Sequence, residues 1–437
     1  MVRACSPEPL IQTKRINHNS VCFYLSAEFS KKYIRQPLLI SYPQEVDLGC
    51  LPTSIVDIPL ITNVIPVIWL SGKEYTIEEM DENLFYSLIK IKTFFKRFFY
   101  NTSWNGELKP ERLVKNTLLK KTIQAASLFT GGLDSTTTLL RHFDENLALI
   151  SFNDAHKNAM NFANKHHFNC YTIYLNYYDF LKLTFLDKAS VDISKWFWDT
   201  TMSLSWIGTA APFLYTKGIP LLYIPSAFTW KSFIFPDGQT LQQPASPLID
   251  ENLTPMGLQV KHDIFTMTRN DKIKFISMFC TEKKISKPQL VVCSHHKKGD
   301  TSYTHCNRCV KCYLTMLNIF AIGEKLQDYG FSLSEDEFMC QFRSYIEKLI
   351  FRRGGTYAAF YDTQNYLRKN IEKLPQTYRS FYDWFIAIDL WGMLDKSSIR
   401  HPRTIPFNWH DYQDLYQGVD DCNTSEHKEV SHSRYYF

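Results

Sequence analysis

The middle of the chain alternates between short apolar runs and longer amphipathic stretches. Because the apolar runs are short and are bounded by polar or turn-forming residues, we expect them to be buried β-strands. The expected strands are residues 125–129, 147–152, 170–175, 221–225 and 289–293. The expected helices between them are residues 135–142, 154–166 (capped by Asp154) and 191–214. This alternation predicts an α/β fold, a parallel sheet with helices on both faces.

The first 120 residues follow a different pattern, in which prolines separate the apolar runs. The strands or extended segments expected here are residues 37–42, 56–59 and 64–69. A helix is expected over residues 77–99, because apolar positions recur there at helical spacing, and a polar linker over 101–121. These segments predict an α+β N-terminal domain over residues 1–120.

From residue 332 onward the pattern becomes helical. Ser334 and Glu337 have the spacing of a capping box at a helix N-terminus. Apolar residues then recur at helical spacing over residues 345–350 and 381–390. We expect no fixed structure in the polar segment 423–433. The expected parts are the N-terminal domain, a central domain over residues 121–328 and a helical C-terminal region with a polar tail over 329–437.

Composition places the chain among soluble globular proteins. Of its 437 residues, 45% are apolar and 21% are charged, and the net charge is +5 without a block of five like charges. No basic stripe indicates a nucleic-acid partner, so we expect none. The first residues lack the apolar run of a signal peptide, and prolines break the apolar segment 58–70. We therefore expect a cytoplasmic protein without a membrane partner, and the sequence leaves a homodimer open.

A glycine-rich turn follows the first expected strand of the central domain. Residues 130–136 read Thr-Gly-Gly-Leu-Asp-Ser-Thr and lead directly into an expected helix. Glycines let the backbone approach a phosphate closely, hydroxyls add hydrogen-bond donors, and a helix N-terminus favours an anion. No Gly-Lys-Ser/Thr follows, so the segment is not a Walker loop. The alternative is an ordinary strand-to-helix turn in which Asp134 and Ser135 cap the helix.

The segment from Phe129 to Thr136 resembles the Ser-Gly-Gly-x-Asp-Ser signature of the PP-loop ATP pyrophosphatase superfamily, with Thr130 in place of the usual Ser. The resemblance implies an adenine nucleotide α-hydrolase-like fold. It implies that ATP and Mg²⁺ bind, that a carboxylate or carbonyl oxygen becomes an AMP ester, and that a nitrogen nucleophile displaces AMP. The residues expected to bind the nucleotide are Thr130, Gly131, Gly132, Leu133, Asp134, Ser135, Thr136 and Phe152. The residues expected to act in catalysis are Ser135, Lys272 and Asp134, the last either through Mg²⁺ or by ordering the turn.

Four cysteines form a second chemical motif. Cys306, Cys309 and Cys312 follow one another at intervals of three, and Cys293 precedes them at the end of an expected strand. Four thiols at tetrahedral reach make a closed structural zinc site. The alternatives are an iron–sulfur cluster or a redox pair, or a zinc site in which a nearby histidine replaces Cys293. The nearby histidines are His295, His296 and His305.

Together, the turn and the cysteines resemble the 7-cyano-7-deazaguanine synthase branch of this superfamily and its uncharacterised zinc-binding relatives. The resemblance covers about residues 124–325. The flanking segments have no counterpart in the small deazaguanine enzymes, which favours a larger acceptor. Asparagine synthetases carry a glutaminase whose cysteine directly follows the initiator Met, whereas Val2 stands here. We therefore expect no ammonia from glutamine.

Polar residues after the fourth expected strand are candidates for the acceptor side of the site. Residues 226–269 form a long irregular stretch at the carboxyl end of that strand, where ligands bind in open α/β sheets. Ser226, Trp230 and Lys231 line either an acceptor pocket or a surface insertion. The residues that meet either a phosphate, an acidic acceptor or only solvent are Lys261, His262, Arg269 and Lys272.

The leading hypothesis is an AMP-forming, ATP-dependent ligase that makes an amide or a nitrile, with ATP and an unidentified acceptor as ligands. The same chemistry on a peptide or protein terminus, or on a tRNA base, is a second hypothesis. A zinc-stabilised nucleotide-binding module without catalysis is a third.

Overall fold

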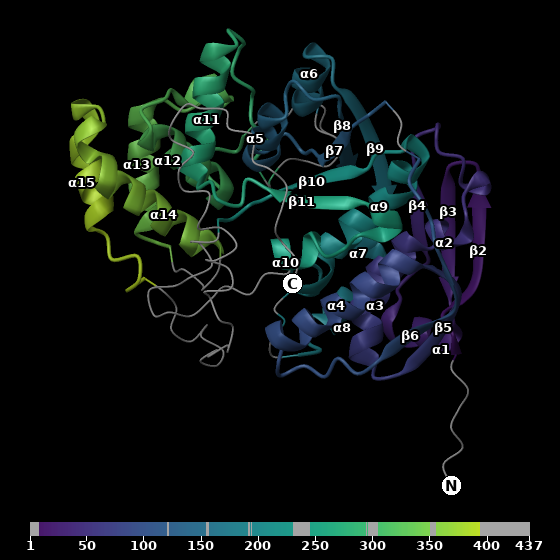
Figure 1. Ribbon diagram of the computed structural model, residues 1–437. Helices are drawn as coiled ribbons and strands as arrows, with labels where there is room; N and C mark the ends of the chain where they lie inside the picture. Colours follow the sequence, from purple (N-terminus) through teal and green to yellow (C-terminus); the bar gives the residue numbers. More distant parts are fainter. Residues whose placement is uncertain are drawn as a thin grey trace, which may run out of the picture.

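The computed structural model describes residues 8–119, 122–153, 157–190, 193, 195–229, 245–293, 295, 305–349 and 355–393. These residues confirm the expected α/β class, and they form a mixed eight-stranded sheet and a separate three-stranded parallel sheet (Figure 1). The strand order of the mixed sheet is β11-β10-β7-β8-β9-β4-β3-β2. Figure 1 shows the N-terminal strands at one end of the molecule and the last helices of the described chain at the other.

Five neighbouring strands of the mixed sheet are parallel. They are β7 (Ala125–Leu128), β8 (Leu147–Phe152), β9 (Asn169–Leu175), β10 (Leu221–Pro225) and β11 (Gln259–Asp263). The chain steps outward from β7 to β8 and β9, then crosses back to β10 on the other side of β7 and continues to β11. The first four strands expected for the central domain are thus confirmed.

The fifth expected strand, over residues 289–293, is wrong, because these residues lie in a segment without strand structure. The fifth strand is β11, inside the stretch expected to be irregular. Its sequence holds one apolar residue, Val260, and among the described strands it lies at an edge of the sheet. The apolar run 289–293 is buried by loop contacts instead: the Leu290 amide donates to the Tyr329 carbonyl (3.1 Å) and the Val291 amide to the Gly131 carbonyl (2.7 Å).

The other three strands of the mixed sheet come from the N-terminal part of the chain and run antiparallel. They are β2 (Ile11–Asn17), β3 (Ser20–Leu25) and β4 (Leu38–Ser41). β4 pairs with β9, with Ile40 opposite Leu175. The strand expected over 37–42 is confirmed, but the expectation of a wholly parallel sheet is wrong, because the N-terminal strands continue the sheet past β9. One sheet therefore crosses the boundary expected near residue 120.

The three-stranded sheet consists of β1 (Glu8–Pro9), β5 (Glu74–Asp81) and β6 (Glu107–Val114), with β5 in the middle. The helix expected over 77–99 begins later, as α4 (Glu82–Phe98), because Asp81 caps it: the Leu84 amide donates to Asp81 Oδ1 (2.8 Å). The expected polar linker over 101–121 contains β6. Most side chains of β6 are exposed or half-buried, which explains its polar sequence.

Helix α3 (Ile58–Ser71) occupies the segment where we expected proline-separated strands, and that expectation is wrong. Pro59 lies in the first turn, where a helix tolerates proline, whereas Pro66 lies inside the helix. Nearly every residue of α3 is buried, and the helix packs against α9 (Met202–Lys217). A helix that is apolar all round belongs in a core. Burial of its apolar surface therefore outweighs the tendency of Pro66 to break the helix.

Alternate residues of the central strands face two cores, one on each side of the sheet. Those facing the first core are Ala126, Leu128, Ala148 and Ile150, and those facing the second are Ala125, Phe129, Leu147 and Leu149. Residues of α3, α4 and α9 line the first core. The helices that line the second core are α5 (Leu133–Arg141), α6 (Lys157–Lys165), α11 (Arg269–Glu282) and α12 (Val310–Ala321). The expectation of helices on both faces is confirmed.

Three C-terminal helices extend the second core beyond α12. They are α13 (Glu335–Ile346), α14 (Gly355–Asn370) and α15 (Arg379–Ala387). The capping box before α13 is confirmed: the Glu337 amide donates to the Ser334 hydroxyl (3.3 Å), and the Ser334 amide donates to the Glu337 carboxylate (2.9 Å). The polar segment 423–433 and Asp154 lie outside the described residues.

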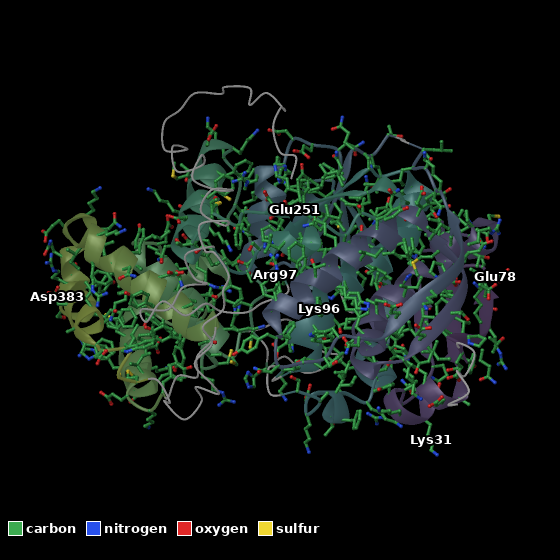
Figure 2. All side chains as sticks on the ribbon, turned by 60° about the horizontal axis from the view of Figure 1, so that its bottom comes forward. Lys31, Glu78, Lys96, Arg97, Glu251 and Asp383 are labelled. Carbon is green, nitrogen blue, oxygen red and sulfur yellow. The ribbon has the colours of Figure 1, made fainter. Side chains whose placement is uncertain are left out.

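The remaining helical elements are short. They are α1 (Ala27–Tyr33), η1 (Leu48–Cys50), α2 (Thr53–Val56), α7 (Tyr177–Phe180), α8 (Leu183–Leu186), the π-helical η2 (Phe197–Thr201), α10 (Pro247–Asp250), η4 (Pro255–Gly257), η5 (Leu326–Tyr329), η6 (Ile371–Lys373) and η7 (Gln376–Tyr378). Figure 2 shows charged side chains of both signs at the edges of the molecule, such as Lys31, Glu78 and Asp383. None of the helices in the described chain has the length and apolar character needed to cross a membrane.

Candidate nucleotide and metal sites

The glycine turn lies where the order of the parallel strands reverses. β8 and β9 lie on one side of β7, and β10 and β11 lie on the other. In open α/β sheets, such a reversal leaves a crevice at the carboxyl ends of the two central strands, and ligands bind there. Residues 130–136 follow the carboxyl end of β7, and Ser226 follows that of β10. The structure therefore brings the expected nucleotide-binding turn and one expected acceptor residue to the same edge of the sheet.

The two glycines of the turn have different roles. Gly131 has a φ of 73°, and a Cβ placed on it would lie 2.3 Å from the Cβ of Ala159 in α6. Gly132 has a φ of −71° and begins α5, and a Cβ placed on it would lie 3.4 Å from Thr130 Oγ1 and from the carbonyl of Val291. Only Gly131 is therefore required by backbone conformation and by close packing.

Hydrogen bonds of hydroxyl groups stabilise the turn internally. The Thr130 amide donates to Ser135 Oγ (3.2 Å), and Ser135 Oγ donates to the Gly132 carbonyl (3.3 Å). The Gly132 amide in turn contacts Thr130 Oγ1 at 3.4 Å. Ser135 and Thr136 are buried, whereas Thr130 is exposed. Thr130 and the first-turn amides of α5, which lack partners within a helix, are the groups that can reach an anion.

Two further residues expected to bind the nucleotide have apolar side chains in the protein interior. The side chain of Leu133 is buried in the second core, so only its backbone amide can serve a ligand. Phe152, at the carboxyl end of β8, is half-buried against the first core. It lies one strand away from the turn, at the same edge of the sheet.

Asp134 lies in a cluster of cations. Lys272 Nζ donates to Asp134 Oδ1 (2.6 Å) and to the Ser226 carbonyl (2.6 Å), and Arg269 Nη2 lies 3.8 Å from Asp134 Oδ2. The side chain of Lys272 is fully buried. Burial raises the pKa of Asp134, but the charges of Lys272, Arg269 and Lys311 outweigh it and hold the pKa below its ordinary value. Burial lowers the pKa of Lys272 despite the charge of Asp134.

This cluster brings together all three residues expected to act in catalysis. Lys272 bridges Asp134 of the turn and Ser226 at the end of β10, and Ser135 is the next residue along the turn. Thr268 positions Lys272 and Arg269 by capping α11, because its hydroxyl accepts from the Asp271 amide (3.2 Å). Of the two roles considered for Asp134, the ion pair favours ordering of the turn.

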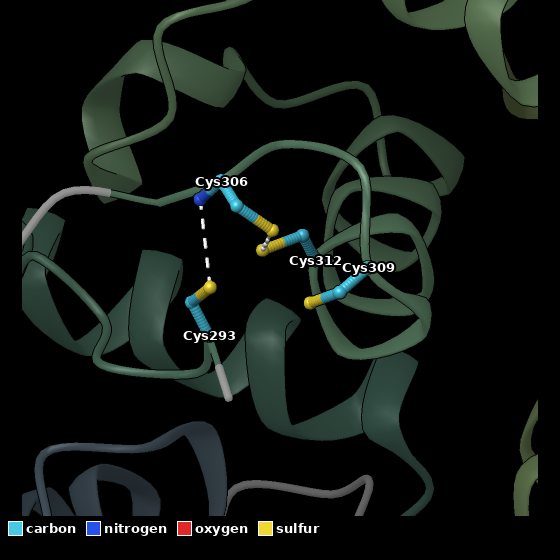
Figure 3. A group of neighbouring side chains, drawn as sticks. All are labelled: Cys293, Cys306, Cys309 and Cys312. Atoms are coloured by element: carbon cyan, nitrogen blue, oxygen red, sulfur yellow. Dashed lines mark hydrogen bonds between the residues drawn. The ribbon is translucent and has the colours of Figure 1, made fainter. Parts of the chain in front are cut away.

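The four cysteine sulfurs converge on one point, as Figure 3 shows, and all lie within 4.8 Å of one another. Cys293 precedes Cys306, and Cys309 and Cys312 belong to the N-terminal end of α12. The sulfurs of Cys306 and Cys312 are 3.9 Å apart. Ligand sulfurs at about 2.3 Å from a tetrahedral Zn²⁺ are about 3.8 Å apart. The group could therefore bind zinc.

Cys293, and not His305, completes this group. His305 Nδ1 bonds to the Gly330 carbonyl (2.8 Å), and its ring stacks on Phe331 with centroids 4.0 Å apart. The amides of His295 and Cys306 point at Cys293 Sγ, at 3.3 and 3.5 Å. Amides that point at a ligand sulfur in this way orient the sulfur toward a bound metal. His296 lies outside the described residues.

The metal group and the glycine turn share a segment of chain. Val291 donates its amide to the Gly131 carbonyl (2.7 Å), and Cys293 follows two residues later. From the other side, Lys311 lies between Cys309 and Cys312 and adds positive charge to the field at Asp134. The position of the cysteines thus affects both the backbone and the charge of the turn.

Sequence reasoning missed Asp250 and named His262 without its partners. Of the alternatives for His262 in β11, exposure to solvent is wrong, because its side chain is buried between Asp250 and Ser226. These three residues form no local motif. The pairing of β10 with β11 brings His262 to Ser226, and the packing of α10 against β11 brings Asp250 to His262. Lys261 is exposed on the same strand, and Trp230 and Lys231 lie outside the described residues.

Comparisons of the chain with protein-family models, with curated proteins and with solved structures find no match. The fold and the sites define an α/β protein that has a glycine turn at the reversal point of its parallel strands and a four-cysteine group able to bind a metal.

Proposed function

We propose that the chain binds ATP at the glycine turn and splits it to AMP and pyrophosphate, in the manner of the PP-loop superfamily that the turn resembles. The observation that carries the proposal is the convergence of the turn, the N-terminus of α5 and the cations of α11 at the reversal point of the strands. In this proposal the parallel strands and their helices form an adenine nucleotide α-hydrolase-like unit.

Each group at this edge has a part in the reaction. The first-turn amides of α5 and the Thr130 hydroxyl hold the pyrophosphate portion of ATP. In this proposal Lys272 and Arg269, which both contact Asp134 of the turn, stabilise the negative charge that grows as pyrophosphate leaves, as preorganised cations do. Ser135 and Asp134 keep the turn in shape, through the hydroxyl network and the ion pair with Lys272.

The residues present fit Mg²⁺ and zinc in different ways. The cysteine group is the only cluster of three or more candidate ligands found among the described residues, and it does not include Asp134. This fits a Mg²⁺ that is held mainly by the phosphates of ATP, where it neutralises charge on the leaving group. We assign zinc to Cys293, Cys306, Cys309 and Cys312, in a closed structural role.

The acceptor side of the site is the carboxyl end of β10. We propose that a carboxylate or carbonyl oxygen placed there attacks the α-phosphorus of ATP, that pyrophosphate leaves, and that the activated group is finally transferred to a nitrogen nucleophile with release of AMP. Ser226 lies at this end, joined to the turn by the Lys272 ammonium. Positioning the two reactants on neighbouring strand ends supplies much of the rate enhancement that such a reaction needs.

The test uses ATP labelled at the α-phosphate, with Mg²⁺ and a mixture of carboxylic acids and amines as acceptors. Labelled AMP is the expected product. Lys272→Met should lower AMP formation at least about 100-fold, which is the loss typical of removing one preorganised charge. The matched control is Lys274→Met, because Lys274 is an exposed lysine on the same helix. Labelled ADP would contradict the proposal, and tight ATP binding without cleavage would support the non-catalytic module.

A further inference from the structure

A buried hydrogen-bonded chain of serine, histidine and aspartate lies beside the proposed nucleotide site. Ser226 follows β10, His262 belongs to β11, and Asp250 ends α10. His262 Nε2 is 2.7 Å from Ser226 Oγ, and His262 Nδ1 is 2.7 Å from Asp250 Oδ2. The residues are 2%, 6% and 0% exposed, respectively. The proposed function uses none of these three side chains.

The order of the contacts prepares the serine hydroxyl to lose its proton. Asp250 takes the hydrogen on Nδ1 and so fixes the tautomer in which Nε2 of a neutral ring is the acceptor. That nitrogen lies 2.7 Å from Ser226 Oγ, and the Ser226 hydroxyl donates to the Phe228 carbonyl (2.7 Å). Rotation of the hydroxyl hydrogen from that carbonyl to Nε2, followed by its transfer to the ring, leaves a nucleophilic oxygen.

The surroundings favour a reaction at a carbonyl group. Lys272 donates to the carbonyl of Ser226, so that a buried ammonium lies beside the serine, where it can stabilise a developing oxyanion. The same ammonium contacts Asp134 of the glycine turn. An acyl group activated at the turn therefore has a short route to Ser226, and the low exposure of Ser226 keeps water away from an ester formed on it.

We propose that Ser226 is a nucleophile that takes over the acyl group from an acyl adenylate, with His262 as general base and Asp250 as its orienting partner. This inference rests on the proposed function for the origin of the acyl group. Ser226 Oγ forms a bond to the acyl carbon, the bond from that carbon to the AMP oxygen breaks, and AMP leaves. The hydroxyl proton passes to His262 Nε2 and then to solvent. A nitrogen nucleophile next attacks the ester, its proton passes through His262 to Oγ, and the amide is released.

The test of the nucleophile needs no ATP, so its outcome is separate from that of the proposed function. The full chain is incubated with p-nitrophenyl acetate, and peptide mass spectrometry locates the acetyl group. An acetyl group on Ser226 is the expected result. His262→Ala and Asp250→Asn should each slow acetylation of Ser226 by about 10²–10⁴-fold, as expected for loss of a general base or of its orientation.

The matched control is Ser246→Ala, because Ser246 is equally buried, lies close to Asp250 in sequence and has a hydroxyl without a hydrogen-bond partner among the described residues. It should leave acetylation of Ser226 unchanged. Absence of acetyl-Ser226 in the wild-type chain would overturn the proposal without depending on any variant. So would an unchanged rate in folded His262→Ala. In either case the three residues serve only to hold the Ser226 carbonyl against Lys272.

Discussion

The conformation and close packing of Gly131 in the glycine turn predict a large loss of stability when this residue is substituted. Replacing Gly131 with Ala forces a non-glycine residue to a φ of 73°. The left-handed conformation costs about 1–2 kcal/mol for such a residue. The new Cβ would also lie 2.3 Å from the Cβ of Ala159 and 3.1 Å from its Cα, so α6 has to move. Overpacking of this kind costs about 1–3 kcal/mol. We therefore expect Gly131→Ala to lower the free energy of unfolding by about 2–5 kcal/mol.

Urea unfolding followed by far-UV circular dichroism measures this loss, and a double-mutant cycle separates its two parts. Ala159→Gly removes the atom that the new methyl group strikes, so it should recover the steric part in the Gly131→Ala background and leave the conformational part. Gly132→Ala is the matched control, because Gly132 has a negative φ and room for a Cβ. It should cost at most about 1 kcal/mol. Equal losses for the two glycines, or a zero coupling energy with Ala159, would refute the described geometry of the turn.

Three further predictions address the metal, the coupling of the sites and the response to pH. Freshly purified protein should contain about one equivalent of zinc by elemental analysis, and Cys309→Ser should bring it below about half an equivalent. Removal of zinc by a chelator should weaken ATP binding in calorimetry, because Val291 joins the cysteines to the turn; unchanged affinity would disprove this coupling. Burial raises the pKa of Asp57 from 3.8 to about 6 despite the charge of Lys14. The folded state therefore holds a proton that the unfolded state releases, and stability should fall by about 2 kcal/mol as the pH rises from 4 to 6.5. In urea unfolding across this range, the fall should be absent in Asp57→Asn; a fall of the same size there would exclude Asp57 as its source.

The sequence predicts those parts of the fold in which local pattern and final environment agree. The strands β7, β8 and β10 are short apolar runs that end up largely buried, so the sequence pattern finds them. β9 is found from its apolar run as well, although only Ile173 and Leu175 are buried. The pattern fails for β11, because an edge strand needs few apolar residues. It also fails for α3, where Pro66 indicates a break but a fully buried helix forms. In both cases the deciding factor is a tertiary neighbour that the local sequence does not show.

The candidate sites also divide into parts that the local sequence indicates and parts that depend on tertiary contacts. The turn and the cysteine group are contiguous or nearly so, and their residue types indicate their chemistry directly. Lys272 could be named as a candidate, but its ion pair with Asp134 depends on how α11 packs against α5. The contact of Ser226, His262 and Asp250 requires the pairing of β10 with β11. Residues that are brought together by sheet pairing leave no periodic signal in the sequence.

The pairing of β4 with β9 has a consequence for how the chain is made. Ile40 lies opposite Leu175, so the strand that completes this part of the sheet is synthesised well before its partner. At the usual speed of translation, the delay between the two residues is on the order of ten seconds. During that time the small antiparallel sheet of β2, β3 and β4 has an open edge at β4, which favours binding by chaperones on the ribosome. Conversely, a chain begun at residue 121 would leave β9 with an open edge, which invites aggregation.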